Sequence, residues 1–151
     1  MHTNYEADSR RTFLFAQKQH YPRDIKPKNI LMKSGVAKIA DLWLAASMKS
    51  KGLSERVGTP LYAAREVFSS PKYDFEADIW SLGMVFSEIL SGKGILALIS
   101  GNVSPSLRSD FPSEDILNNI KSDRLRNLIS KMLQKESSDR PSAQQVLNLL
   151  S

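Results

Sequence analysis

The most regular pattern of apolar and polar positions in the chain covers residues 77–91. Apolar side chains recur there at the spacing of one helix face: Ile79, Leu82, Val85, Phe86, Ile89 and Leu90. Gly92 follows the last of them, and glycine is favoured after a helix C-terminus because it adopts left-handed backbone angles. The apolar face is broad, so the pattern predicts a helix that is buried on most of its sides.

Shorter helices are predicted on both sides of this one. Their ranges are residues 9–20, 114–120, 123–134 and 142–150. Ser122 and Ser142 suit the N-terminal cap or first turn of a helix, and Pro141 suits a helix start. Residues 41–61 and 93–113 show no sustained period and are predicted to be irregular.

Two short apolar runs, residues 29–32 and 36–40, flank the sequence Lys33-Ser34-Gly35. Runs of this length around a glycine-containing turn are typical of a β-hairpin. Gly35 is expected to take the left-handed position of the turn. The whole pattern therefore predicts a mainly α domain with one small β-hairpin.

Composition narrows the class of protein. A chain of 151 residues, 41% of them hydrophobic, is long enough for one domain with a sizeable core. It contains no cysteine, which excludes disulfides and thiolate metal sites. No apolar run approaches the ~20 residues of a membrane span, and residues 1–11 lack the apolar core of a secretory signal. These features predict a cytoplasmic or nuclear protein that does not contact membranes.

The formal net charge of +5 is unevenly distributed. Residues 1–75 contain 13 lysines and arginines against 7 acidic residues, whereas residues 76–151 contain 8 against 9. A basic half can bind nucleic acid, but no aromatic stacking motif accompanies this charge, so nucleic-acid binding is not expected. The lysines at positions 26, 28, 33 and 38 are better explained by a phosphate site or a solvated hairpin.

Candidate chemistry is concentrated at the predicted hairpin. Residues 23–31 read Arg-Asp-Ile-Lys-Pro-Lys-Asn-Ile-Leu, and Asp41 follows ten residues after Leu31. Asp24 can accept a hydrogen bond from a hydroxyl group, and Lys26 can lie near a phosphoryl group that is being transferred. Asn29 and Asp41 offer the hard oxygens that Mg²⁺ prefers. Each is more often a solvated surface residue, but the set predicts a site for phosphoryl transfer.

Further motifs follow in order along the chain. They are Gly58-Thr59-Pro60-Leu61-Tyr62, Ala64-Arg65-Glu66, Asp78-Ile79-Trp80-Ser81-Leu82-Gly83 and Asp139-Arg140-Pro141. With the first loop they resemble the C-terminal lobe of eukaryotic-type protein kinases, in the serine/threonine pattern. A resemblance to NIMA-related kinases is weaker.

The resemblance divides the chain as one partial kinase domain over residues 1–151. Its parts are a catalytic loop at 22–31, a metal loop at 41–43, an activation segment at 41–66 and a helical core at 77–150.

The resemblance also implies roles for individual residues. Asp24 would be the catalytic base, with Lys26 and Thr59 as its phosphate and substrate partners. Lys26, Asn29, Leu31 and Asp41 would bind ATP, with Leu31 beneath the adenine, and Asn29 and Asp41 would hold Mg²⁺. Pro60 and Leu61 would shape the pocket for a protein substrate.

Other matched residues are structural in the family. Glu66 would pair with Arg140, and Asp78 would hydrogen-bond the backbone of the catalytic loop. Glu55 stands where many kinases carry a phosphothreonine and could pair with Arg23; a solvated Glu55 is the alternative.

The sequence departs from the kinase pattern at several positions. No glycine-rich loop and no strand lysine precede Pro22, which itself replaces His or Tyr. Asp41-Leu42-Trp43 stands in place of Asp-Phe-Gly, and Arg65, expected to be exposed, replaces a proline.

We therefore expect a C-terminal lobe without its N-terminal lobe, inactive by itself. A pseudokinase-like module that binds a protein partner is one alternative, and a decayed, partly stable gene product is another.

Overall fold

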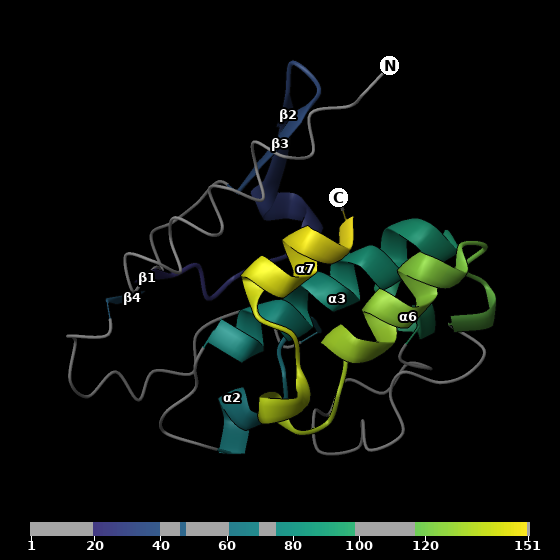
Figure 1. Cartoon of the computed structure of the whole chain (residues 1–151). Helices are drawn as coiled ribbons and strands as arrows, with labels where there is room; N and C mark the ends of the chain where they lie inside the picture. The colour runs from purple at the N-terminus through teal and green to yellow at the C-terminus, as the bar shows by residue number, and fades with distance from the viewer. Residues whose placement is uncertain (1–19, 40–45, 48–60, 70–74, 99–116, 151) are drawn as a thin grey trace.

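A computed structural model describes residues 20–39, 46–47, 61–69, 75–98 and 117–150 of the chain. The described part is a body of helices from which one β-hairpin projects (Figure 1). The mainly α prediction is confirmed. None of the described helices is long and apolar enough to cross a membrane.

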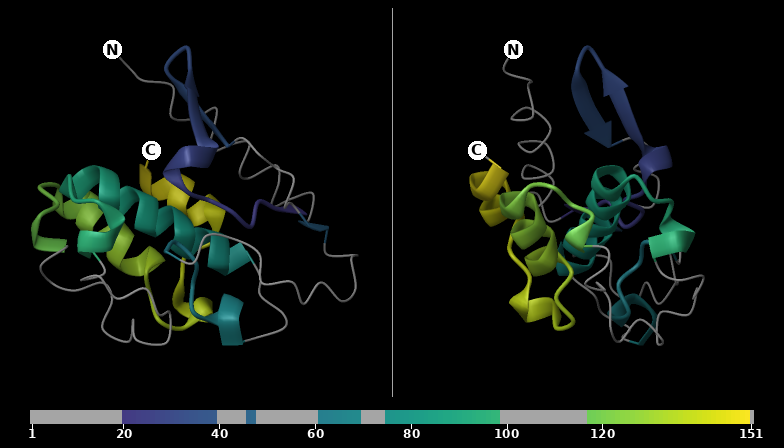
Figure 2. Two further views of the ribbon diagram at one scale, coloured as in Figure 1. Left: turned by 180° about the vertical axis from the view of Figure 1, so that it is seen from behind. Right: turned by 90° about the vertical axis from the view of Figure 1, so that its right-hand side faces the viewer.

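Helix α3, Phe75–Ser91, is the longest of the described elements and runs through the middle of the helical body (Figures 1 and 2). It begins two residues before the predicted start and ends where predicted, with Gly92 at a φ of 68°. Its buried residues lie around most of its circumference: Ala77, Ile79, Trp80, Ser81, Gly83, Met84, Val85 and Ser87. The broad apolar face thus corresponds to a helix covered on several sides, as predicted.

Helices α6, Asp123–Met132, and α7, Ala143–Leu150, lie beside α3 (Figure 1). Ser122 caps α6 by accepting a hydrogen bond from the Leu125 amide, and Ser142 accepts one from the Gln145 amide. The Gln145 side chain in turn accepts from the Ser142 amide at 2.7 Å, which completes a reciprocal cap. Helix α6 ends two residues before the predicted residue 134. Of the predicted helix 114–120, residues 114–116 lie outside the described residues, 117 and 118 are helical, and 119 and 120 are not.

Two short helices contribute side chains to the core. Helix α2 covers Glu66–Ser69, and helix α4 covers Ile95–Leu98. The prediction that residues 93–113 are irregular is wrong at α4. Ile95 and Leu98 are 8% and 3% exposed, so packing of one helical turn against the core, rather than a period in the sequence, fixes this element.

Within the part of the chain that the structure describes, the core has two clusters that share α3. The larger joins α2, α3, α4 and α6 around Trp80, Met84 and Ile129, and the smaller joins α3, α6 and α7 around Met132 and Val146. Phe86 packs against both clusters, so the two parts of the core are in contact.

The hairpin consists of β2, Ile30–Lys33, and antiparallel β3, Val36–Ile39, with Lys33 opposite Val36. Ser34 and Gly35 form a two-residue turn with φ angles of 52° and 75°. Both angles are positive, as in the turn type that matches strand twist. The predicted strand start is wrong by one residue, because Asn29 belongs to the short 3-10 helix η1, Pro27–Asn29.

A second pair of strands was not predicted. Strand β1, His20–Tyr21, pairs antiparallel with β4, Ala46–Ser47. The predicted helix 9–20 is therefore wrong at residue 20 and otherwise lies outside the described residues. Irregular structure over 41–61 is likewise wrong at residues 46–47, because two-residue strands form through long-range pairing that leaves no period in the sequence.

Candidate active site

Asp24, Lys26 and Asn29 converge at the start of the hairpin. The side-chain nitrogen of Asn29, Nδ2, donates to the Asp24 backbone oxygen and to Asp24 Oδ2, both at 2.9 Å. Lys26 Nζ lies 2.6 Å from the same Oδ2. Asn29 is 5% exposed, so the residue that orients the carboxylate is itself fixed by burial.

The local backbone explains why these residues meet. Pro27 starts η1, where its fixed φ suits a helical turn and its missing N–H is not needed. The backbone N–H of Asn29 then donates to the Lys26 carbonyl at 2.9 Å. This single turn brings Asn29 back over Asp24, so the trio is assembled by five consecutive peptide bonds rather than by distant elements.

Helix α3 also holds the segment that carries the trio, through a contact between Asp78 and Arg23. The Arg23 amide donates to Asp78 Oδ1 at 3.1 Å, while Arg23 has a φ of 63°, in the left-handed region. A non-glycine residue there is strained, and the hydrogen bond from the first turn of α3 helps to maintain it. The contact expected between Asp78 and the catalytic loop is therefore present.

Asp78 is an electrostatically unusual group. Burial raises the pKa of its carboxyl to about 7, although the Arg23 amide and the Arg23 charge act in the opposite direction. Its Oδ2 atom is buried and has no hydrogen-bond partner among the described residues. The carboxyl thus sits where its charge is poorly solvated.

The expected pair of Glu66 and Arg140 is also present. Arg140 Nη1 and Nη2 both donate to the Glu66 carboxylate, the second at 3.2 Å. The remaining donors bind backbone carbonyls of Gln134, Lys135 and Glu76. The guanidinium carbon also lies 5.0 Å from the centre of the Trp80 ring. One buried cation therefore joins α2, α3 and the segment before α7.

Arg65 forms a second, more exposed ion pair beside the first. Its Nη2 atom lies 2.9 Å from Glu136 Oε1, and the two side chains are 33% and 66% exposed. Arg65 was expected to be exposed, and its side chain is only partly exposed. Its charge is paired with the short segment that also carries Arg140.

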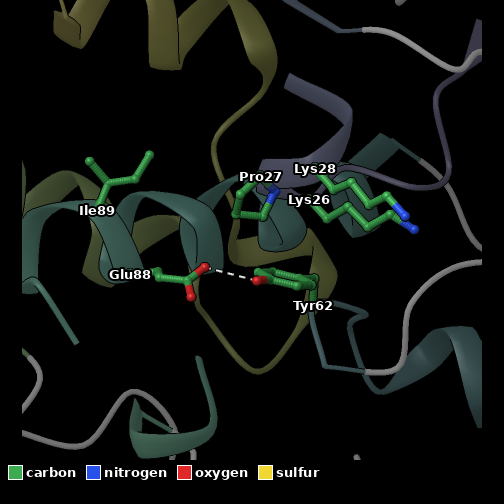
Figure 3. A pocket seen from close by; sticks show the side chains of 6 residues that line it. All are labelled: Lys26, Pro27, Lys28, Tyr62, Glu88 and Ile89. Atoms are coloured by element: carbon green, nitrogen blue, oxygen red, sulfur yellow. Dashed lines mark hydrogen bonds between the residues drawn. The ribbon is translucent and has the colours of Figure 1, made fainter. Parts of the chain in front are cut away.

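A cavity of about 340 Å³ opens next to the trio, lined by Lys26, Pro27, Lys28, Tyr62, Glu88 and Ile89 (Figure 3). Tyr62 donates its hydroxyl to Glu88 Oε2 at 2.8 Å, and the Ile95 amide donates to Glu88 Oε1 at 2.9 Å. Burial first, and the neighbouring Glu88 second, raise the pKa of Tyr62 well above its ordinary value. The phenol therefore remains a hydrogen-bond donor at neutral pH.

Sequence reasoning placed Lys28 only among lysines near a phosphate site or on a solvated hairpin, and it gave no site role to Tyr62 or Glu88. Glu88 carried one available signal, an acidic residue inside the strongly apolar pattern of α3. A charged residue at such a position needs a polar partner. The partner, Tyr62, lies 26 positions away in the chain, and periodicity cannot reveal that contact.

Comparison with known proteins identifies the family. The family model described as protein kinase domain matches residues 12–149. The chain belongs to the protein kinase family.

The named relatives are serine/threonine kinases. The chain is 35% identical to serine/threonine-protein kinase dst1 of Dictyostelium discoideum over 139 residues, which is 83% of this chain and 18% of that protein. It is also 35% identical to fray2 of the same organism over 132 residues, covering 79% of this chain and 12% of the relative. Serine/threonine-protein kinase ATG1b of Arabidopsis thaliana is 40% identical over 76 residues, 47% of this chain and 11% of that protein. The chain thus spans less than a fifth of the length of these relatives.

Of the remaining predicted site residues, the structure describes only Leu31 and Leu61. Asp41, Glu55, Thr59 and Pro60 lie outside the described residues. Leu31 is on the projecting hairpin with 55% of its surface exposed. Leu61 is half-buried and packs against the larger core cluster.

The described residues contain no group of three or more His, Cys, Asp or Glu side chains that could hold a metal ion. A magnesium ion in a kinase needs fewer protein ligands, because one or two carboxylate or amide oxygens suffice when phosphates supply the other ligands. Asn29 fits this requirement, since its side-chain nitrogen makes the two hydrogen bonds to Asp24 and its side-chain oxygen is the atom suited to a metal.

Proposed function

We propose that these 151 residues form the C-terminal-lobe part of a serine/threonine kinase domain, which binds a protein segment beside Asp24. We further propose that, tested by themselves, they do not transfer phosphate from ATP. The observation that carries the first statement is the assembled trio of Asp24, Lys26 and Asn29, held in place by Asp78.

The trio has the chemistry that the family reaction requires. The Asp24 carboxylate can accept a hydrogen bond from a serine or threonine hydroxyl and orient it for attack. Lys26 lies against that carboxylate at 2.6 Å and brings a positive charge to the place where phosphate oxygens would gather. Asn29 fixes the carboxylate through its nitrogen.

ATP and magnesium are the cofactors that the family implies, and the residues present fit part of that role. Asn29, together with Asp41, would supply oxygens to magnesium, which neutralises phosphate charge when it is bound. The exposed side chain of Leu31 offers an apolar surface for the adenine. These assignments rest on the matched positions and on the chemistry of the side chains.

The proposal of inactivity rests on other positions. Gly35 is the first glycine of the sequence, so no glycine-rich phosphate loop precedes Asp24 within these residues. Trp43 stands where the family has glycine, and tryptophan resists the backbone angles that glycine permits. Binding of a protein segment without turnover is the function that fits both groups of observations.

Catalysis by the chain itself is the second candidate, and the trio is the specific observation in its favour. Purified chain would be incubated with radiolabelled Mg-ATP and a serine-containing protein substrate, alongside Asp24→Asn. We expect no transfer above the background of the variant. Transfer that requires Asp24 would overturn the proposed inactivity and establish the second candidate.

A further inference from the structure

The cavity beside Asp24 has an uneven distribution of charge. Lys26 and Lys28 line it on one side and Glu88 on another, with Pro27 and Tyr62 between them (Figure 3). In Figure 3 both lysine side chains extend away from Glu88. An entering group therefore meets cationic and anionic ends that are separated by apolar surface.

At the anionic end, Glu88 is already engaged with the protein. One carboxylate oxygen accepts from the Tyr62 hydroxyl at 2.8 Å and the other from the Ile95 amide at 2.9 Å. Since both oxygens have protein donors, a cationic ligand would have to share or displace these hydrogen bonds. Glu88 is thus better explained as a residue that holds Tyr62 and α4 than as a ligand site.

At the cationic end, the two lysines differ. Lys26 is ion-paired with Asp24 at 2.6 Å, so much of its charge is compensated. Lys28 is exposed and forms no ion pair or hydrogen bond with any residue that the structure describes. Lys28 is therefore the cation of the cavity that is available to a ligand.

We propose that this cavity recognises an acidic side chain of the bound protein segment, with Lys28 as the residue that binds it. This inference rests on the proposed function, because it names the chemistry of the segment held beside Asp24. The apolar part of the segment would lie on Pro27, Tyr62 and Ile89, which is 64% exposed. Lys28 is adjacent in sequence to the trio, so the acidic residue would lie close to the serine or threonine presented to Asp24.

Binding of fluorescent peptides to the full chain, measured by anisotropy at low salt, tests the proposal directly. Each peptide has one central serine and one aspartate placed within about four residues of it, a reach of about 13 Å of extended chain. Matched peptides carry asparagine or lysine in place of the aspartate. We expect the aspartate peptide to bind at least about threefold tighter than the asparagine peptide at one or more positions, as for an exposed ion pair.

Variants assign this preference to Lys28. Lys28→Gln should abolish the difference between the aspartate and asparagine peptides, and Lys28→Glu should make the lysine peptide the tightest. Lys33→Glu makes the same change of charge on the hairpin outside the cavity, and it should leave the order of affinities unchanged. Circular dichroism of each variant shows whether the fold is retained; both lysines are exposed, so no change is expected.

The outcomes separate this inference from the proposed function. Equal binding of the three peptides, or tightest binding of the lysine peptide to the unmodified chain, would overturn the role of Lys28 while a segment is still bound. Absence of binding by every peptide would overturn the proposed binding function as well. An aspartate preference that survives in Lys28→Glu would show that another cation is responsible.

Discussion

Arg140 shows how one side chain can determine whether separate segments stay together. Its side chain is completely buried, and its donors reach the Glu66 carboxylate and three backbone carbonyls. A guanidinium has five N–H groups in a fixed plane, which lysine could not match. The buried charge is tolerated because its donors have partners and the Trp80 ring lies close by.

Replacing Arg140 with methionine should therefore be much more damaging than the same change at Arg65. Arg140→Met leaves the Glu66 carboxylate and several carbonyls without donors, and we expect a loss of about 3–5 kcal/mol in the free energy of unfolding. Arg65→Met breaks only the more exposed pair with Glu136, for which about 1 kcal/mol or less is expected. Urea unfolding followed by circular dichroism measures both, and equal losses would contradict the assignment.

Asp78 should make stability depend on pH. Its pKa is about 7 in the folded protein and about 3.9 when unfolded. Between these values the folded state binds more protons, so the free energy of unfolding falls as pH rises from about 4 to about 7 and then levels off. Asp78→Asn keeps an oxygen for the Arg23 amide but cannot ionise.

The wild type should accordingly lose stability relative to Asp78→Asn across this range of pH. Urea titrations of both proteins at several pH values give the difference in their free energies of unfolding. The contributions of the other carboxyl groups cancel in this difference. A difference that is constant between pH 4 and 7 would mean that the carboxyl of Asp78 is already ionised in the folded protein at low pH.

At the scale of residues, the sequence predicts those contacts that lie within one short segment or that a motif encodes. Asp24, Lys26 and Asn29 meet because a single turn after Pro27 brings them together. The contacts of Glu66 and Asp78 were expected only through the resemblance to kinases. The link between Tyr62 and Glu88 was missed, because it depends on how the segment before α2 lies along α3.

At the scale of elements, periodicity predicted the long helix and the hairpin and failed for the shortest pieces. Helix α3 repeats its apolar pattern over several turns, and the Ser34-Gly35 turn has a local backbone requirement. Helix α4 and the strands β1 and β4 have two to four residues each, too few to show a period. Their structure depends on tertiary packing and pairing, which a linear pattern does not contain.

Gly83 allows α3 and α6 to approach closely, which gives a prediction at this scale. A Cβ atom at position 83 would lie 3.0 Å from Leu133 Cδ2 and 3.1 Å from Met132 Cβ. Both neighbours are fully buried, and the second contact involves an atom fixed to the backbone. Gly83→Ala gains about 1 kcal/mol of helix propensity, but overpacking costs about 1–3 kcal/mol.

We therefore expect Gly83→Ala to lower the midpoint of thermal unfolding. Gly94→Ala is the matched control, because a Cβ atom there has nothing within 4 Å and the backbone angle is not left-handed. Its effect should stay within about 0.5 kcal/mol, as for most surface changes. Stabilisation by Gly83→Ala would show that α3 and α6 can move apart without cost.

At the scale of the whole molecule, the helical body and the hairpin differ in how far packing in the core stabilises them. Among the residues whose side chains the structure describes, the two core clusters draw on α2, α3, α4, α6 and α7 and on none from β2 or β3. Residues 31–33 are exposed, including Met32 at 68%. A two-stranded hairpin without a packed face is only marginally stable.

Hydrogen exchange should reveal this difference directly. Amides of α3 are expected to exchange only through global unfolding, at rates that rise steeply with urea, whereas those of β2 and β3 exchange through local opening that urea affects little. Met132→Ala removes a fully buried side chain from the core and should cost about 2–5 kcal/mol. That variant should accelerate exchange in α3 and leave the hairpin rates unchanged. Equal acceleration in both elements would instead show that the hairpin and the helical body unfold as one cooperative unit.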